Sequence, residues 1–419
     1  MTDQHNKPAH TRPALVTFAL AMGAFAIGTT EFAAMSLVPY FARDLHLTEP
    51  QAGHAISAYA LGVFVGAPII AVLAARMGRR ALLIGLMALF ALGNGLSALA
   101  PSYPLLIAFR FLSGLPHGAY FGVAALVAAS MVAENRRAQA VAMVMSGLTV
   151  ATIIGVPAAN WLGQALGWRA GFAVVSVLAL MTMASVALFA PHQPPAEGAS
   201  AARELSALRR PQVLLTLLTG AIGFGGLFAV YTYVASTMIE VTKVSEGLVP
   251  VVLAVFGVGM TVGNLFWAWA ADRAQSRAAI GALLFSAFSL ALFPFAAGSL
   301  WSLIPVILMV GFSGGLGTIL QTRLMDVAGE AQALAAAAHH SAFNFANALG
   351  PWLGGLAISA GWGLTSTGWI GAGLSLGGLA VFLLTLLHHK RGADMDAAPA
   401  CAYACLLYTS PSPRDQRGS

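Results

Sequence analysis

The chain alternates between long apolar stretches and short polar connections. Windows of about 20 apolar residues are typical of helices that cross a membrane, and the sequence contains twelve such windows. The connections carry turn-forming residues or charge, as in RMGRR at 76–80, PSYP at 101–104 and DRAQSR at 272–277. The predicted spans are 14–38, 52–75, 81–100, 105–130, 140–163, 170–190, 213–237, 248–271, 278–298, 302–325, 336–360 and 368–388. We therefore expect an all-α integral membrane protein with twelve transmembrane helices.

The composition agrees with this prediction and excludes a soluble protein. Only 9% of the 419 residues are charged and 58% are hydrophobic, whereas soluble domains carry about 25% charged residues. The formal charge of +6 is spread over short loops, so it indicates no nucleic-acid partner. Cys401 and Cys405 are the two cysteines and both lie in the tail. This pattern offers no disulfide framework and no metal-ligand spacing, and we expect no metal and no cofactor.

Lysine and arginine residues gather in one set of loops, which predicts the orientation of the chain. Fifteen of them lie in the termini and in the connections on one side, and only Arg43, Arg169 and Lys243 lie in the opposite connections. Cytoplasmic loops carry the excess of these residues. Both termini should therefore be cytoplasmic, in a multi-pass protein of the bacterial inner membrane.

The two halves of the chain resemble each other. The longest polar gap, 191–212, separates the spans into six and six. An offset of 197 places Gly62, Gly66, Arg76 and Arg80 on Gly259, Gly263, Arg273 and Arg277, and an offset of 195 places Ser146 and Gly155 on Ser341 and Gly350. Such repeats are typical of secondary transporters, in which the substrate binds between the halves near the midplane of the bilayer.

The predicted domain boundaries follow from this division. Residues 1–13 form a cytoplasmic N-terminus, 14–190 a first six-helix bundle, 191–212 a cytoplasmic linker, 213–388 a second six-helix bundle, and 389–404 a cytoplasmic tail. The stretch CLLYTSPSPRD at 405–415 resembles the translated sequence of a sequencing adapter. We expect residues 405–419 to be an artefact and leave them out of the fold.

Two charged residues lie well inside the predicted spans. Glu31 is the only such acid and Arg110 the only clear such base, and each costs about 2.5–3.5 kcal/mol on insertion scales. Their distances from the outer ends of their helices are similar, so the two side chains can pair if the helices are neighbours. In one interpretation Glu31 is a proton site that Arg110 controls. In the other, the two form a permanent structural ion pair.

Several uncharged or weakly basic residues inside the spans are further candidates. His117 lies two turns after Arg110 on the same helix face, where it could relay a proton or be a packing residue. His340, Asn344, Asn347 and Pro351 form a polar stripe in HHSAFNFANALGP. The stripe fits a substrate cavity wall, and equally hydrogen bonds between helices. Tyr231, Tyr233, Asn264 and Gln321 are weaker candidates, for which packing is the simpler interpretation.

Five short motifs resemble the major facilitator superfamily, in its drug:proton antiporter branch, over about residues 14–390. These motifs are GTTEF followed by SLVP (28–39), AARMGRR (74–80), RFLSGLPHG (110–118), Gly147 with GVP (155–157), and GWRAGF (167–172). The arabinose-efflux-like, purine-efflux-like and chloramphenicol-efflux-like bacterial members are the most similar. The resemblance implies that Arg110 takes part in proton transfer and that Gly147, Gly155 and Pro157 form the antiporter motif.

The loop motif departs from the family pattern at two positions. The family's usual acid is replaced by Ala75 and its leading glycine by Ala71. In the family this acid belongs to a charge network that latches the outward-open state, so the first half lacks part of that gate. The expected gating loops then comprise Arg76, Gly78, Arg79 and Arg80 in the first half and Asp272 and Arg273 in the second. The basic residues alone also fit simple positive-inside anchoring.

We therefore expect a monomeric, proton-coupled secondary transporter that exports a small molecule by alternating access. Glu31, Arg110 and His117 would couple protons, and Tyr231, Asn264, His340, Asn344 and Asn347 would line the substrate cavity. The alternative is a proton symporter or facilitator that imports a small metabolite, because the fold serves both directions. The sequence shows no catalytic triad or acid cluster, and none of its three lysines lies in a Gly-rich nucleotide loop. An enzyme and an ATP-driven pump are therefore disfavoured.

Overall fold

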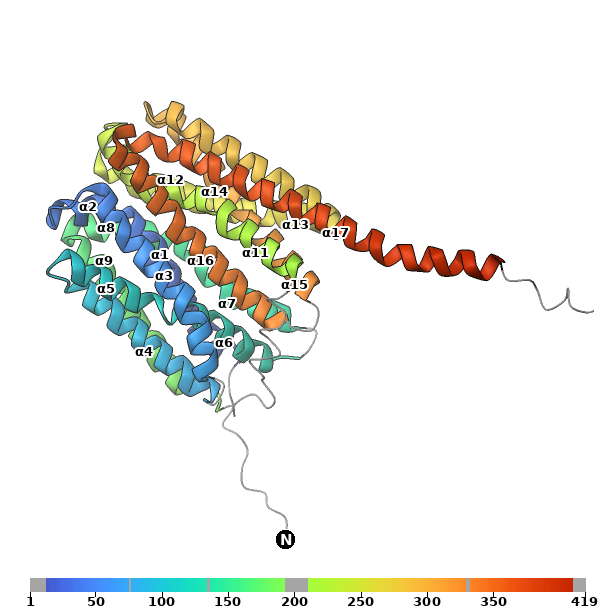
Figure 1. The fold of residues 1–419 in the computed structure, drawn as a ribbon. Helices are drawn as coiled ribbons and strands as arrows, with labels where there is room; N and C mark the ends of the chain where they lie inside the picture. Colours follow the sequence, from blue (N-terminus) through green and yellow to red (C-terminus); the bar gives the residue numbers. More distant parts are fainter. Residues whose placement is uncertain (1–12, 75–76, 134–135, 193–209, 329–331, 410–419) are drawn as a thin grey trace, which may run out of the picture.

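The computed structural model describes residues 13–74, 77–133, 136–192, 210–328 and 332–409, and these residues form helices and no strands (Figure 1). Nine helical stretches within this part of the chain are long and apolar enough to cross a membrane. One of them, Glu246–Ala296, contains the predicted span 248–271 and all but the last two residues of the predicted span 278–298. Two further predicted spans form the long helices α3 and α16. The prediction of an all-helical protein with twelve spans is confirmed.

The first half of the chain builds one group of helices, here called the first bundle. It comprises α1 (Pro13–Ser36), α2 (Val38–Asp44), α3 (Glu49–Ala74), α4 (Arg79–Ala98), α5 (Tyr103–Gly114), α6 (His117–Ser130), α7 (Arg137–Val150), the π-helical turn η2 (Ala151–Gly155), α8 (Val156–Leu166) and α9 (Trp168–Phe189). Most of the predicted linker, 193–209, lies outside the described residues.

The second half builds the second bundle. It comprises α11 (Pro211–Gly223), α12 (Gly225–Glu240), η3 (Glu246–Leu248), α13 (Val249–Ala296), α14 (Leu300–Phe312), η4 (Ser313–Gly315), α15 (Leu316–Ala328), α16 (Gln332–Ala357), η5 (Ile358–Trp362), η6 (Leu364–Ser366) and α17 (Thr367–Thr409). Helix α17 thus continues beyond the predicted span into the predicted tail.

Local breaks divide several spans that look continuous in the sequence. Pro116 caps the start of α6 and separates it from α5, because proline cannot donate the backbone hydrogen bond that a helix interior requires. Pro157 stands in the first turn of α8, directly after the π-helical turn η2. Helix α13 shows the opposite case, because it runs through two predicted spans. Its non-helical dihedral angles at Ala274 lie in the polar connection predicted between these spans.

Glycine contacts between helices repeat with the offset of 197 predicted from the sequence. In the first bundle, a methyl group added to Gly62 would overlap the carbonyl oxygen of Phe111, and in the second a methyl group on Gly259 would overlap that of Leu308. Phe111 and Leu308 are themselves related by the same offset. The helix pairs α3–α5 and α13–α14 therefore pack in the same way, with glycine at each close approach.

The second predicted offset, 195, is wrong for the helix contacts. Gly147 of α7 packs against Ala21 in α1, whereas Gly350 of α16 packs against Gly225 in α12. This match requires an offset of 203 for the two glycines and of 204 for their partners Ala21 and Gly225, so Gly350 corresponds to Gly147 and not to Gly155. Loop lengths differ between the halves, and no single offset can therefore relate all of their helices.

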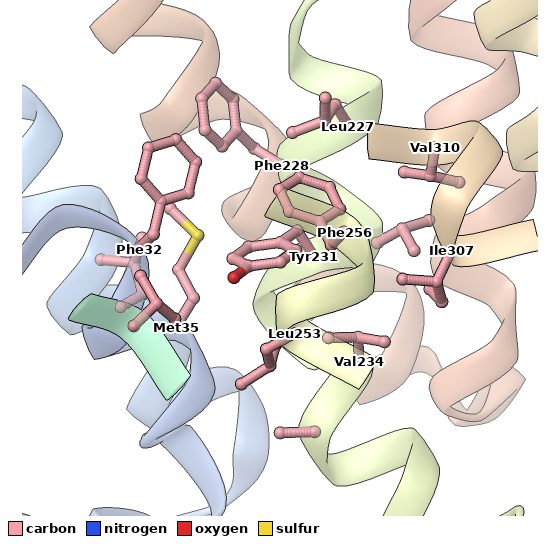
Figure 2. Packing of buried hydrophobic residues seen from close by; sticks show 14 of the residues in the cluster. Phe32, Met35, Leu227, Phe228, Tyr231, Val234, Leu253, Phe256, Ile307 and Val310 are labelled. Atoms are coloured by element: carbon pink, nitrogen blue, oxygen red, sulfur yellow. The ribbon is translucent and has the colours of Figure 1, made fainter. Parts of the chain in front are cut away.

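The two bundles meet along a mostly apolar interface. Helix α1 packs against α12, α3 against α16, and η2 and α8 against α13. At its centre, Phe32 and Met35 of α1 face Phe228 and Tyr231 of α12 (Figure 2). The Phe32 and Tyr231 rings meet edge to face with centroids 5.8 Å apart. A single hydrophobic cluster thus crosses from one bundle to the other.

Candidate functional site

Glu31 lies at the interface between the bundles. Helix α1 is apolar over nearly its whole length, and the Glu31 side chain is only 3% exposed. Asn347 of α16 donates a hydrogen bond from Nδ2 to Glu31 Oε1 at 3.0 Å. The buried carboxylate of the first bundle is therefore held by an amide of the second bundle, 316 positions away in the chain.

Arg110 is fully buried close to Glu31. Its Nη1 donates to Thr30 Oγ1 at 3.2 Å, and Thr30 donates in turn to Asn94 Oδ1 at 2.6 Å. The guanidinium carbon lies 4.3 Å from the Tyr59 ring centroid and 5.0 Å from that of Phe172. Within the described chain, Arg110 Nε and Nη2 have no hydrogen-bond partner. Two aromatic rings and one hydroxyl group therefore stabilise the Arg110 cation, while its Nε and Nη2 donors are left without a partner among the described residues.

The predicted pairing of Glu31 with Arg110 is not present in this conformation. Among the described residues no ion pair within 4 Å joins them. Arg110 instead bonds Thr30, the residue next to Glu31 in the chain, which places the two charges in the same region. Their direct pairing remains a prediction for another conformation.

His117 belongs to the same cluster through a residue that the sequence analysis did not single out. Tyr59 Oη and His117 Nδ1 are 2.8 Å apart, and both side chains are buried. Since the face of the Tyr59 ring lies over Arg110, the ring connects Arg110 to His117. Beyond His117, the Phe121 ring is stacked on His340 of the second bundle, with centroids 5.6 Å apart.

The predicted polar stripe on α16 faces the first bundle in part. Asn347 contacts Glu31 and His340 contacts Phe121, as described above. Asn344 donates to the carbonyl oxygen of His340 in its own helix, at 3.0 Å. The Oδ1 atoms of Asn344 and Asn347 are buried and have no partner within the described residues.

The remaining predicted cavity residues divide between the centre and the periphery. The Tyr231 ring lies 4.0 Å from that of Phe256 and touches Phe32, at the centre of the interface (Figure 2). Asn264 instead accepts a hydrogen bond from Thr318 of the same bundle at 3.3 Å. Tyr233 donates to the carbonyl oxygen of Pro351 at 2.9 Å, also within the second bundle.

The predicted gating residues that the structure describes lie at the start of α4 in the first bundle and within α13 in the second bundle. Arg76 falls outside the described residues, while Gly78 precedes α4 in an extended conformation. Arg80, which follows Arg79, contacts His192 at 2.7 Å and the carbonyl oxygen of Ala187, and so joins the start of α4 to the end of α9. In the second half Arg273, next to Asp272, lies over the Trp269 ring at 4.0 Å.

The predicted antiporter motif places helix α7 and the turn η2 against α1. A methyl group on Gly147 would overlap the carbonyl oxygen of Ala21, and one on Gly155 would overlap the Thr29 hydroxyl. The turn η2, which Pro157 follows, also contacts α13 of the second bundle. The motif therefore lies between Glu31's helix and the other bundle.

The ends of the bundles at residues 43–49, 99–100, 164–169, 236–248 and 297–299, here called the distal end, are joined by polar contacts. Arg43 Nη2 and Glu246 Oε1 form an ion pair at 2.8 Å. Ser236 Oγ donates to Glu49 Oε2 at 2.5 Å, and Gln164 Nε2 donates to the carbonyl oxygen of Glu246 at 2.9 Å. Each contact links one bundle to the other. A cavity of about 650 Å³ opens beside them, lined by residues of both bundles.

A second distal ion pair lies wholly within the first bundle. Arg169 of α9 bonds the carboxylate of Asp44 at the end of α2, and Trp168 Nε1 donates to the same oxygen at 3.0 Å. The hydrogen bond from Arg169, followed by that from Trp168, lowers the pKa of Asp44. This pair fixes the loop after α2 to α9 and does not bridge the bundles.

Three polar residues of the site were missed in the sequence: Thr30, Tyr59 and Asn94. An amide inside the apolar helix α4 is the signal that could have identified Asn94. For Tyr59 the repeat offers a signal, because the offset of 197 places it on Phe256 and Arg110 on Ile307. The polar cluster thus occupies positions that are apolar in the second half.

Comparisons with known proteins agree with this architecture. The family model described as the Major Facilitator Superfamily matches residues 20–338 and 231–400. The chain is 41% identical to the inner membrane transport protein YdhP of Escherichia coli K12 over 374 residues, which cover 89% of this chain and 96% of that protein. It is 34% identical to a chloramphenicol resistance protein of Streptomyces lividans, over 93% of this chain and 99% of that protein. It is 27% identical to a probable sugar efflux transporter of Haemophilus influenzae, over 89% and 94% of the two chains.

The matched segments include both bundles and the helices that carry Glu31's partners. A buried carboxylate between two repeated bundles fits the architecture of a secondary transporter. The chain belongs to the Major Facilitator Superfamily and is a multi-pass membrane transporter rather than an enzyme.

Proposed function

We propose that the protein is a proton-coupled exporter of a small molecule across the bacterial inner membrane. Glu31 takes up a proton when the site faces the outside and releases it when the site faces the cytoplasm. The substrate moves outward in exchange. Arg110 and His117 assist the proton transfer, and both termini lie in the cytoplasm. The monomer contains the complete pathway.

The position of Glu31 carries this proposal. Among the described residues it is the only acid in the middle of a predicted span, and its one hydrogen bond there comes from the opposite bundle. A carboxylate in such a place is costly and usually functional. Because alternating access moves one bundle relative to the other, a titratable group on the contact between them can tie protonation to that movement.

The names of two relatives support export. One relative is called a chloramphenicol resistance protein and another a probable sugar efflux transporter. Both match this chain over nearly its whole length. These names favour efflux over uptake, and they favour an uncharged substrate of moderate size.

The substrate site lies next to Glu31, between α1, α12 and α16. Tyr231 and Phe256 supply an aromatic surface for an apolar body (Figure 2). Asn344 and Asn347 supply buried carbonyl oxygens that accept hydrogen bonds. His340 lies one turn further along α16. Apolar walls with a few polar groups are typical of small-molecule sites.

The test uses everted membrane vesicles that contain the wild type or Glu31→Gln. The vesicles are energised, chloramphenicol and a panel of sugars are added singly, and the collapse of the inward pH gradient is followed. We expect a substrate to collapse the gradient with the wild type and not with Glu31→Gln, because an amide cannot exchange a proton. Glu31→Asp should retain part of the response.

Asp326→Asn is the matched control, since it makes the same change from carboxylate to amide at an exposed residue. It should behave as the wild type. A wild-type response in Glu31→Gln would remove Glu31 from the coupling mechanism. Gradient-independent equilibration of a substrate in both variants would indicate a facilitator.

A further inference from the structure

The hydrogen bond between Asn347 and Glu31 has a property that sets it apart from the other contacts in the middle of the interface. It joins an ionisable group of the first bundle to a polar side chain of the second. The nearby cross-bundle bond from Ser57 Oγ to the carbonyl oxygen of Ala348, at 2.9 Å, involves no group that titrates. Only the Asn347 bond changes its strength when Glu31 gains or loses a proton.

The chemistry of the two partners fixes the direction of this change. An ionised carboxylate only accepts hydrogen bonds, and Asn347 presents its Nδ2 donor to it. A bond to a charged acceptor is roughly twice as strong as one between neutral groups. Both side chains are buried, with Glu31 3% and Asn347 0% exposed, and this exclusion of water strengthens the bond further. Protonation removes the charge and leaves a weaker neutral bond.

We propose that Asn347 is a positioning residue that holds the two bundles together while Glu31 is ionised and the carrier is empty. This inference rests on the proposed function, in which Glu31 is the proton site. Protonation weakens the contact and frees the bundles to move. An exchanger needs such a restraint, because an empty, unprotonated carrier that moves freely dissipates the gradient without transporting substrate.

The buried acceptor oxygens of α16 indicate how a bound substrate releases the same restraint as a proton does. Asn347 Oδ1 and Asn344 Oδ1 lack partners among the described residues. A substrate that carries a hydroxyl or amide N–H group can donate to these oxygens and turn the Asn347 amide away from Glu31. Proton and substrate then release the same restraint by different means.

Other ionisable groups near Glu31 belong to several helices. Arg110 of α5 and Tyr59 of α3 are the closest, and His117 of α6 follows through Tyr59. Helix α12 contributes Tyr231 and α16 contributes His340. Charged residues on the elements α2 and α7 to α9 that flank α1 lie near the ends of those elements: Arg43, Asp44, Arg137 and Arg169. Within the described chain, the hydrogen bond to the Glu31 carboxylate comes from the uncharged Asn347 amide and not from these ionisable groups.

The test measures the separation of the distal ends as a function of pH. Spin labels are attached to cysteines at Leu99 in the first bundle and Ser299 in the second, which are both exposed. Cys401 and Cys405 are replaced by serine, and the protein is held in lipid nanodiscs between pH 5 and 9. We expect the wild type to be closed at high pH and to gain a separated population as the pH falls.

Asn347→Ala should raise the separated population at high pH about tenfold, because the bond to a charged group is lost. Its pH response should be largely abolished, as in Glu31→Gln. Asn160→Ala is the control: Asn160 is equally buried and donates to the carbonyl oxygen of Ser36 at 2.9 Å, but within the first bundle.

Because Asn160 also accepts from Gln164, which contacts Glu246 of the other bundle, Ser375→Ala is a second control. Buried Ser375 Oγ lies 2.9 Å from Ser286 Oγ, wholly within the second bundle. Ser375→Ala should respond to pH as the wild type does.

The outcomes separate the two proposals. If Glu31→Gln abolishes the response but Asn347→Ala keeps it in full, Glu31 remains the proton site and Asn347 is not its restraint. If Glu31→Gln keeps the response, the proposed proton site fails as well. Should Asn347→Ala not fold, Asn347→Leu answers the same question, since leucine has a similar volume but offers Glu31 no hydrogen-bond donor. A closed Asn347→Leu at high pH would overturn the inference.

Discussion

At the scale of single residues, the site depends on how polar groups are satisfied in an apolar surrounding. Arg110 is buried against two aromatic rings, and the tyrosine ring among them also contacts His117. Tyr59 therefore has two roles. The face of its ring stabilises the Arg110 cation, and its hydroxyl group is the hydrogen-bond partner of His117. The two roles can be separated by removing the hydroxyl alone.

Tyr59→Phe should lower the stability of the protein while leaving the Arg110 contact in place. The change leaves a buried His117 nitrogen without its partner, which costs about 1–3 kcal/mol. Thermal unfolding followed by tryptophan fluorescence in detergent measures the loss. Tyr103→Phe is the control, because Tyr103 Oη contacts His54 Nδ1 at the same 2.8 Å in a partly exposed place. An equal effect of both changes would contradict the role of burial.

Asp44 gives a prediction of pH dependence outside the membrane. Its folded-state pKa is lowered by Arg169, so its contribution is present above the unfolded pKa of about 4 and is lost as the pH falls through the folded pKa. Asp44→Asn should therefore lower stability at pH 7 by at most about 1 kcal/mol, since the pair is largely exposed. The melting temperatures of the two proteins should converge as the pH falls below the lowered folded pKa of Asp44. A gap that widens in acid would refute the assignment.

The candidate site shows which residue-level features can be read from a sequence. Glu31, Arg110 and His117 could be selected in advance, because ionisable groups stand out in apolar spans. Their partners could not, since the bond from Asn347 to Glu31 depends on the packing of helices 316 positions apart. The expected direct pair of Glu31 and Arg110 relied only on their similar depth in the membrane. Depth does not determine the direction in which each side chain points.

At the scale of elements, glycine determines how closely the helices approach. Gly114 of α5 lies against the carbonyl oxygen of Tyr59, and Gly311 of α14 lies against that of Phe256. The offset of 197 relates both members of these contacts, so the two bundles use one packing scheme twice. The spans and this offset were predictable because hydrophobic length and glycine spacing are local patterns. Pro116 and Pro157 mark in the sequence where a span can break, but whether the break becomes a helix end before α6 or the π-helical turn η2 depends on the packing around each proline.

Gly114→Ala and Gly311→Ala should each destabilise the protein by about 1–3 kcal/mol, because an added methyl group forces two backbones apart. Gly85→Ala is the control, since Gly85 is exposed on α4 and an added methyl group meets no atom within 4 Å. It should be neutral or slightly stabilising. The measurement is the melting temperature together with the yield of monodisperse protein. A loss in only one of the two bundles would argue against equivalent packing.

At the scale of the whole molecule, polar contacts at the distal end keep the two bundles together. Both side chains of the Arg43–Glu246 ion pair are exposed, Arg43 to 57% and Glu246 to 39%. Such a pair contributes about 0–1 kcal/mol, so it can open during a transport cycle. Together with the bond from Ser236 to Glu49, it forms a closure that is weak enough to be reversible.

If transport requires the distal end to open, a covalent link across this closure should stop it. Cysteines at Arg43 and Glu246, in a background with serine at 401 and 405, are joined by a bifunctional thiosulfonate reagent. We expect substrate-dependent collapse of the pH gradient to disappear and to return after reduction, because the link prevents the bundles from separating. Cysteines at Asp44 and Arg169 provide the control, since that ion pair lies within one bundle. Linking them should leave transport intact. Undiminished transport through the Arg43–Glu246 link would mean that the bundles do not separate at this end, and the exchange cycle would then need a different moving part.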